Sequence, residues 1–358
     1  MKKLIALCIL SACHFNLFGQ SSGLDKFIES YTKENDFNGT ILIHQQAKTI
    51  YHESFGWANF EFKVPNTTDT RYKIASITKL FTSVLIMQLV EKDIIDLNQS
   101  INTYLPAYEG EGADKVSVRQ LLNHTSGMVN IDAGTSLESA LHNGIPLYQK
   151  PRSPDELLRD FCSGKLENNP GEVFDYNNAD YIVLGKIIEK VYNKAYEQVL
   201  FENILQPLEM INTGLIHQGK IFENLANTYF FRDDLERLVP DLPVYMENWY
   251  AAGAMYSTSS DILQFSEALF GLKLLQQESL DQMFVSGLGE YGYGVWVYED
   301  YPINNKMYKI IKRPGRIMGA QAMLFHVLNE DATIIILSNT GTTSLDNFAA
   351  DLADQMIK

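Results

Sequence analysis

The stretch SITKLFTSVLIMQLV, residues 76–90, decides the fold prediction because it joins a reactive pair to a strongly apolar helix. Ser76 and Lys79 lie three residues apart, slightly less than one helical turn, so the hydroxyl and the amine face the same side. A serine hydroxyl is a weak nucleophile until a base removes its proton, and a partly desolvated lysine can be that base. Free N–H groups at the helix start would stabilise an oxyanion. The stretch therefore predicts Ser76 as a nucleophile with Lys79 as its neighbour.

The spacing alone does not identify a catalytic site, because the sequence contains a second copy of it. Ser30 and Lys33 stand at the end of the first predicted helix among charged residues, where we expect a solvated surface turn without a catalytic role. The copy at Ser76 differs because the apolar helix would bury its polar pair. Buried polar groups are costly unless they are hydrogen-bonded, which favours a functional interpretation.

A second candidate group is Tyr176 and Asn178, which form the only Tyr-x-Asn in the sequence. On a loop ahead of a helix, Tyr176 could act as general acid or base if a nearby cation lowered its pKa from about 10. Asn178 could donate a hydrogen bond to an amide carbonyl of a substrate. In the alternative interpretation, the tyrosine only packs and the asparagine caps a helix that begins at Ala179.

The pattern of apolar residues predicts an α+β fold. Two hairpins are expected, one from residues 39–44 and 49–55 and the other from residues 321–327 and 332–338. Apolar periodicity predicts helices at both ends of the chain and, between the hairpins, mainly helical structure. The helices expected are 24–31, 77–90, 181–192, 262–270 with a cap at 259–261, and one from about Ser344. We therefore expect one antiparallel sheet built from both chain ends, flanked by helices, with an inserted mainly helical lobe.

The composition limits the kinds of partner. The 358 residues carry a formal net charge of −15, and such an acidic surface repels phosphate backbones and anionic lipid headgroups, so we expect no nucleic acid partner. No Gly-rich phosphate loop and no Cys/His metal spacing occurs in the sequence. We therefore expect a small-molecule or peptide substrate, no cofactor and no metal. The oligomeric state is not indicated.

The N-terminal residues predict export from the cytoplasm. Two lysines precede the apolar run 4–10, as in a secretory signal. Residues 10–13 resemble a lipobox, with cleavage at 12/13 and a lipid on Cys13 as the only membrane attachment; the alternative is cleavage near 19/20. We expect a signal segment at 1–20 and a single catalytic domain at 21–358. The product would be periplasmic, a membrane-anchored lipoprotein, or secreted.

The two motifs, separated by about a hundred residues, resemble the serine β-lactamase/penicillin-binding-protein superfamily. The sequence is most similar to class C β-lactamases and their esterase and D,D-peptidase relatives. Further blocks that match, in order, are 55–59 with 65–67, 121–127, 181–185, 252–258 and 335–339. The resemblance covers nearly the whole mature chain and implies a β-lactamase/transpeptidase-like fold. It also implies that His124 is a structural loop residue.

The third motif of that family departs from its usual form. Where the family carries Lys-Thr-Gly or His-x-Gly, this chain has Arg313, Pro314 and Gly315. Arg313 keeps a positive charge suited to a carboxylate but cannot shuttle protons, and Pro314 removes a hydroxyl. Gly315 would let substrate approach the strand, and the Arg316 backbone N–H would complete an oxyanion hole with that of Ser76. The alternative is that Arg313 is merely an exposed basic residue.

The resemblance implies a serine hydrolase that cleaves an ester or amide through an acyl-enzyme on Ser76. Its substrate would be a cell-wall-type peptide, a D-amino-acid amide or ester, or a β-lactam, although the altered third motif argues against an efficient β-lactamase. The alternative is a penicillin-binding-like sensor with the same fold that has lost turnover. The presence of all four residues of the first two motifs, Ser76, Lys79, Tyr176 and Asn178, favours the enzyme.

Overall fold

A computed structural model describes residues 23–133 and 136–357 of the chain. The predicted signal segment, with its two cleavage sites, lies outside these residues. Within the described residues, no helix is long and apolar enough to cross a membrane.

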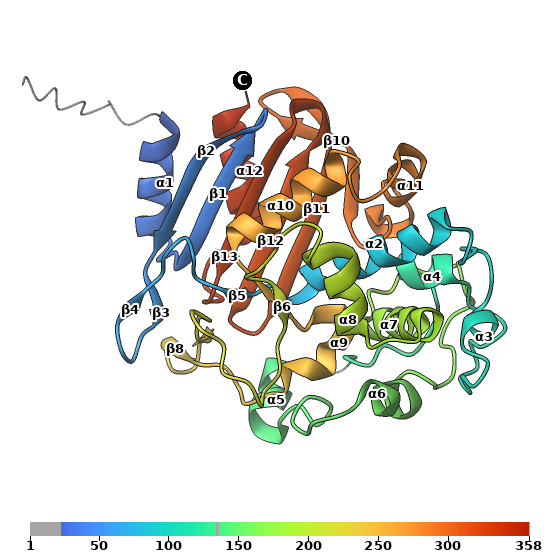
Figure 1. Ribbon diagram of the computed structural model, residues 1–358. Coiled ribbons are helices and arrows are strands. Elements are labelled where there is room, and N and C mark those ends of the chain that lie inside the picture. Colours follow the sequence, from blue (N-terminus) through green and yellow to red (C-terminus); the bar gives the residue numbers. More distant parts are fainter. Residues whose placement is uncertain (1–22, 134–135, 358) are drawn as a thin grey trace, which may run out of the picture.

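The centre of the fold is a six-stranded antiparallel sheet with the strand order β10-β11-β12-β13-β1-β2. Its N-terminal strands pair directly with its C-terminal ones, from Gly39 opposite Ser338 to Gln45 opposite Ala332. Figure 1 shows the blue strands β1 and β2 beside the red strands β12 and β13. The prediction of one sheet built from both chain ends is therefore confirmed. The strands are β1 (Gly39–Gln45), β2 (Lys48–Phe55), β10 (Trp296–Ile303), β11 (Lys306–Ile317), β12 (Ala320–Val327) and β13 (Ala332–Ser338).

Helices cover both faces of this sheet because its inner strands are apolar on both sides. Side chains alternate between the faces of a strand, so Ile334 and Ile336 of β13 join one core while Ile335 and Leu337 join the other. The first core is closed by the terminal helices α1 (Gly23–Glu34) and α12 (Leu345–Met356). The second contains residues of α10 (Ser259–Phe270), which lies across the sheet in Figure 1.

The inserted lobe is mainly helical, as predicted. Its longest helices are α2 (Thr78–Glu91), whose residues are buried from Thr78 through Met87, and α7 (Asn178–Tyr192). Smaller helices are α3 (Ile101–Tyr104), α4 (Val118–Leu122), α5 (Leu137–Asn143), α6 (Pro154–Phe161), α8 (Tyr196–Leu200), α9 (Tyr250–Gly253) and α11 (Gln277–Met283). The sequence did not predict the short strands β3 (Trp57–Asn59), β4 (Val64–Pro65), β5 (Tyr72–Lys73), β6 (Gly214–Leu215), β7 (Tyr229–Arg232), β8 (Arg237–Pro240) and β9 (Met255–Ser257).

The start of α10 differs from the prediction. The helix begins at Ser259 rather than after Asp261, and its cap is Thr258, whose hydroxyl accepts a hydrogen bond from the Asp261 N–H at 3.2 Å. The predicted cap at 259–261 is therefore wrong by one helical turn. The threonine takes the role because its backbone is extended while its side chain reaches a free N–H of the first turn.

Candidate active site

Ser76 is the middle residue of a short 3₁₀ turn, η1 (Ala75–Ile77), directly before α2. Its neighbours Ala75 and Ile77 are buried, whereas Ser76 keeps part of its surface exposed. Ala75 has a φ of 47°, a left-handed conformation that is unfavourable for a residue with a Cβ. The surrounding packing holds this turn in place, so the Ser76 side chain is the one of the three that remains accessible. The second Ser-x-x-Lys lies in α1 with Ser30 and Lys33 exposed, as expected for a surface position.

Lys79 lies completely buried in the first turn of α2, beside Ser76. Its Nζ donates to Ser76 Oγ at 3.2 Å, to Asn178 Oδ1 at 2.6 Å and to the Ala252 carbonyl at 2.9 Å. Burial lowers the pKa of Lys79 because the charged form loses its hydration, and the Arg313 charge lowers it further, while Tyr176 opposes this. The structure thus brings together the predicted nucleophile and its lysine.

Asn177, not Asn178, caps helix α7: its side chain accepts a hydrogen bond from the Ala179 N–H at 3.0 Å. The alternative interpretation of Asn178 as a cap is therefore wrong, because the helix begins one residue earlier. This leaves the Asn178 amide free to bond Lys79 through its oxygen. The Tyr176 ring lies on the other side of the lysine, with its centroid 4.8 Å from Nζ.

Arg313, on β11, is 0% exposed and donates to three protein groups. Its Nε lies 2.7 Å from the Ser76 carbonyl oxygen, and its two terminal nitrogens lie 2.8 Å from Tyr291 Oη and 2.6 Å from Tyr176 Oη. The alternative of an exposed basic residue is therefore wrong. Binding of a substrate carboxylate by Arg313 stays a prediction, and it would require the guanidinium to leave these partners.

The two cations change the acidity of Tyr176. Burial acts to raise the pKa of its phenol, but the positive charges of Arg313 and Lys79 outweigh burial, and hydrogen bonds from Lys79 and Ser76 add to their effect. The pKa is therefore lowered to about 8. At this value about one tenth of the side chain is phenolate at pH 7 and about half at pH 8, so a form able to act as a general base is accessible.

Gly315 allows β11 to approach the turn that carries Ser76. A Cβ at this position would lie 2.3 Å from the Ile74 carbonyl oxygen and 3.1 Å from the Ser76 nitrogen. The strand's free edge begins nearby, since pairing with β10 ends at Lys312. The last residue pair before the turn to β12 is Ile317 with Ala320. Backbone N–H groups along a strand point alternately to its two neighbours, so when the Ile317 N–H points to β12 the Arg316 N–H points to the free edge. This placement fits the predicted oxyanion hole, whose role in catalysis stays a prediction.

Replacing Gly315 by Ala is expected to lower kcat/KM by about 100-fold, because the added methyl group must push β11 away from the Ser76 turn, and a misplacement of about 1 Å costs that much. The measurement is ester hydrolysis by the purified variant. Gly164→Ala is the matched control, since a Cβ there meets nothing within 4 Å. Equal activity of the two variants would contradict the close-approach argument.

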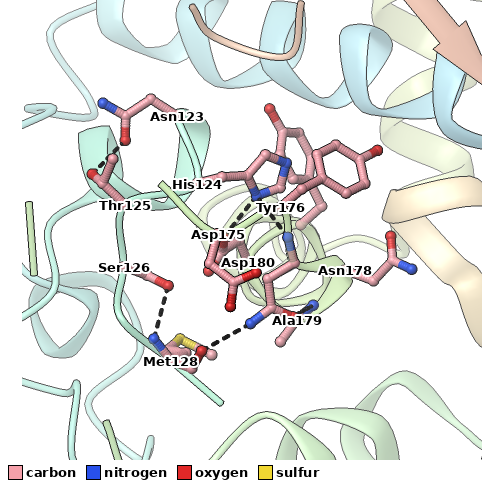
Figure 2. A network of polar contacts seen from close by, with 12 residues as sticks. Asn123, His124, Thr125, Ser126, Met128, Asp175, Tyr176, Asn178, Ala179 and Asp180 are labelled. Atoms are coloured by element: carbon pink, nitrogen blue, oxygen red, sulfur yellow. Dashed lines mark hydrogen bonds and ion pairs between the residues drawn. The ribbon is translucent and has the colours of Figure 1, made fainter. Parts of the chain in front are cut away.

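A buried pair, His124 and Asp180, lies under Tyr176 (Figure 2). His124 Nδ1 is 2.7 Å from Asp180 Oδ2, and both side chains are 0% exposed. The Asn177 N–H also donates to Nδ1, at 3.3 Å, so this nitrogen is an acceptor and the proton between the pair belongs to Asp180. Burial raises the pKa of Asp180 well above, and lowers that of His124 well below, the ordinary value. We infer that the pair is neutral. The His124 ring packs against the Tyr176 ring, with their centroids 4.5 Å apart, so the pair helps to hold the phenol in position.

If the pair is neutral, Asp180→Asn should cost only about 1 kcal/mol of unfolding free energy, since the amide N–H can replace the acid proton. Asp180→Ala should cost about 3 kcal/mol because it leaves a cavity and an unpaired histidine nitrogen. Urea unfolding of both variants measures the difference. Equal losses would indicate an ionised pair instead.

Three residues of this site were not predicted from the sequence. Tyr291 binds Arg313 from a loop with no recognisable pattern. Asp132 accepts from Asn178 Nδ2 at 2.6 Å and also lies on a loop. Asp180 gave a usable signal, because it is a carboxylate followed directly by the apolar residues of α7. For the part of the chain with described coordinates, no group of three His, Cys, Asp or Glu residues could hold a metal ion.

Comparison with known proteins identifies the family. The family model described as Beta-lactamase matches residues 24–355, so the chain belongs to the beta-lactamase family. It is a serine hydrolase of the β-lactamase-related class, and its relatives include proteins named as a penicillin-binding protein and as a teichoic acid D-alanine hydrolase.

Two relatives show the range of the similarity. Penicillin-binding protein 4* of Bacillus subtilis is 28% identical over 334 residues, which cover 88% of this chain and 71% of that protein. Teichoic acid D-alanine hydrolase of Staphylococcus aureus is 26% identical over 238 residues, or 66% of this chain. The matched part spans 55% of that hydrolase.

Solved structures show the same fold at lower sequence identity. A penicillin binding protein from Bacillus halodurans has a TM-score of 0.78 at 24% identity, covering 93% of this chain and 99% of that one. A D-amino acid amidase from Ochrobactrum anthropi SV3 has a TM-score of 0.77 at 21% identity, covering 93% and 97%. The β-lactamase-like fold expected from the sequence is therefore confirmed.

Proposed function

We propose that the protein hydrolyses an ester or amide through a covalent acyl-enzyme on Ser76. The observation that carries this proposal is the grouping of Lys79 and Tyr176 beside Ser76. Lys79 donates a hydrogen bond to Ser76 Oγ, and the Tyr176 phenol accepts one from Arg313 at 2.6 Å. A serine in this setting has a general base whose pKa lies close to working pH, which is the condition for efficient proton transfer.

In the proposed mechanism, Tyr176 acts with Lys79 as a coupled base that removes the Ser76 proton. Ser76 Oγ attacks the carbonyl carbon, and the N–H groups of Ser76 and Arg316 bind the resulting oxyanion. When the intermediate collapses, the bond to the leaving group breaks and Tyr176 returns the proton to it. A water molecule, deprotonated by the same tyrosine, then attacks the acyl carbon. The bond from that carbon to Ser76 Oγ breaks, Tyr176 returns the proton to Oγ, and the acid product leaves.

We propose that Arg313 serves the base rather than transferring protons itself. A guanidinium stays protonated at all working pH values, so it cannot replace a shuttling lysine or histidine. It can, however, stabilise a phenolate permanently, and its bond to the Ser76 carbonyl fixes the nucleophile relative to that phenolate.

For the substrate, we propose a D-amino-acid ester or amide, or a cell-wall-type peptide, in preference to a β-lactam. Two relatives support this class: one is named a teichoic acid D-alanine hydrolase and the other a D-amino acid amidase. Pro314 lacks the hydroxyl that β-lactamases direct to the substrate carboxylate, and Arg313 is occupied by protein partners. We also propose that the protein acts outside the cytoplasm, whichever of the two predicted sites in the signal segment is cleaved. The charged start and the apolar run of the N-terminal sequence support this location.

A fluorophosphonate probe should add one adduct to the wild-type protein, detected by intact mass, and none to Ser76→Ala. Ser30→Ala is the matched control because it removes the serine of the surface copy, and it should label fully. Labelling of Ser76→Ala would disprove the assignment of the nucleophile.

Turnover then separates the enzyme from the sensor alternative. Hydrolysis of a p-nitrophenyl ester should continue for many equivalents of product per protein. A single burst followed by a stable acyl-protein would instead identify a penicillin-binding-like sensor.

The pH profile tests the role of Arg313. Since the phenolate is the active form, kcat/KM for a neutral ester should rise with pH through a midpoint near 8. Arg313→Met removes the cation that stabilises the phenolate, so the midpoint should move upward by about one unit or more, whereas Arg313→Lys should move it less. A midpoint that stays in place in Arg313→Met would rule out this role.

A further inference from the structure

The Asp132 carboxylate is connected to the nucleophile through only two side chains. Its Oδ2 accepts from Asn178 Nδ2 at 2.6 Å, and the oxygen of the same amide accepts from Lys79 Nζ at 2.6 Å. Lys79 in turn donates to Ser76 Oγ. A negative charge is thus placed on the Asn178 side of the reacting centre.

Several neutral contacts fix this carboxylate in one orientation. Tyr148 donates to Oδ1 at 2.6 Å, and its ring is stacked on Trp249 with centroids 3.5 Å apart. The Asp132 N–H donates to Asn130 Oδ1 at 3.1 Å, and the Asn130 amide donates to the Tyr176 carbonyl at 3.0 Å. The loop of Asp132 is therefore tied to the segment that carries the general base, so the carboxylate is preorganised.

Within residues 23–133 and 136–357, Asp132 forms no direct ion pair: no Lys, Arg or His nitrogen there lies within 4.0 Å of the carboxylate. Lys79 acts on it only through space, with the Asn178 amide between them. Both side chains that donate to the carboxylate, Tyr148 and Asn178, are neutral. Asp132 is half-buried. Each carboxylate oxygen has a second acceptor site left after these bonds. A partly desolvated anion of this kind is stabilised further by a cation at hydrogen-bond distance, and the protonated amine of a ligand would supply one.

We propose that Asp132 is a specificity-determining residue that binds the protonated α-amine of an aminoacyl substrate. The inference rests on the proposed function, since it assumes that Ser76 attacks an acyl carbonyl. In such a substrate the amine nitrogen is only two bonds from the carbon that Ser76 Oγ attacks, so it must lie close to the nucleophile. Acyl groups with a free amine should therefore be preferred over acyl groups without one.

The test compares two esters with the same carbon skeleton, the p-nitrophenyl esters of D-alanine and of propionic acid. Their ratio of kcat/KM is measured for the wild type and for Asp132→Asn. The asparagine keeps the shape and both hydrogen bonds, since its oxygen can accept from Asn178 and its amide can donate to Tyr148 Oη. Loss of a charge-assisted hydrogen bond should lower the ratio at least about tenfold. Glu138→Gln, which removes one negative charge from the exposed first turn of α5, is the matched control and should retain the ratio.

Two results would overturn the inference while leaving the proposed function intact: an unchanged ratio in Asp132→Asn, or an equal loss on both esters, which would mean that Asp132 acts through Asn178 and Lys79. A folding defect would also lower both esters together, so circular dichroism of the variant accompanies the assay. If the wild type hydrolyses neither ester and Ser76 takes no acyl label, the proposed function itself fails, and the inference fails with it.

Discussion

The arrangement of the candidate catalytic residues depends on one buried cation, Arg313. Its guanidinium joins the sheet to the helical lobe by binding the backbone of the nucleophile and the phenols of Tyr176 and Tyr291. Removing one partner of a buried charge costs several kcal/mol because the other is left uncompensated. The same side chain therefore contributes to the position of the Ser76 turn and to the acidity of Tyr176.

The charge balance of the site supports the proposed role of Tyr176 as the base. Lys79 and Arg313 are both fully buried, and both lie close to the Tyr176 ring, with Lys79 Nζ 4.8 Å and Arg313 Cζ 5.6 Å from its centroid. The carboxylic acid beneath them, Asp180, is kept neutral by burial and its histidine partner. With Asp180 neutral, the phenolate is the anion best placed to offset these two cations, so the fold favours the ionised form of Tyr176 that the chemistry needs.

The sequence was sufficient for the sheet and for selecting the candidate residues that the structure brings together, because both follow local patterns. Alternating apolar runs at the two chain ends predicted β1, β2, β12 and β13, and the apolar helix α2 distinguished Ser76 from Ser30. The position of Arg313 could not be derived in this way, since a basic residue after Lys312 resembles a solvated strand end, and only the register of β11 turns it inward. Asp132 acquires its position from tertiary hydrogen bonds alone, and the cap of α7 moved by a single residue.

The pairing of β1 with β13 also has a consequence for biosynthesis. Because the central sheet joins segments from opposite ends of the chain, the ribosome must release most of the protein before this sheet can close, and such long-range closure is slow. Arg313 is likewise made long after Ser76. A nascent chain therefore carries the proposed nucleophile without the cation that lowers the pKa of Tyr176, and on the proposed mechanism hydrolytic activity should appear only when the last strands have docked. The pairing of the two chain ends thus makes completion of the site one of the last steps of folding.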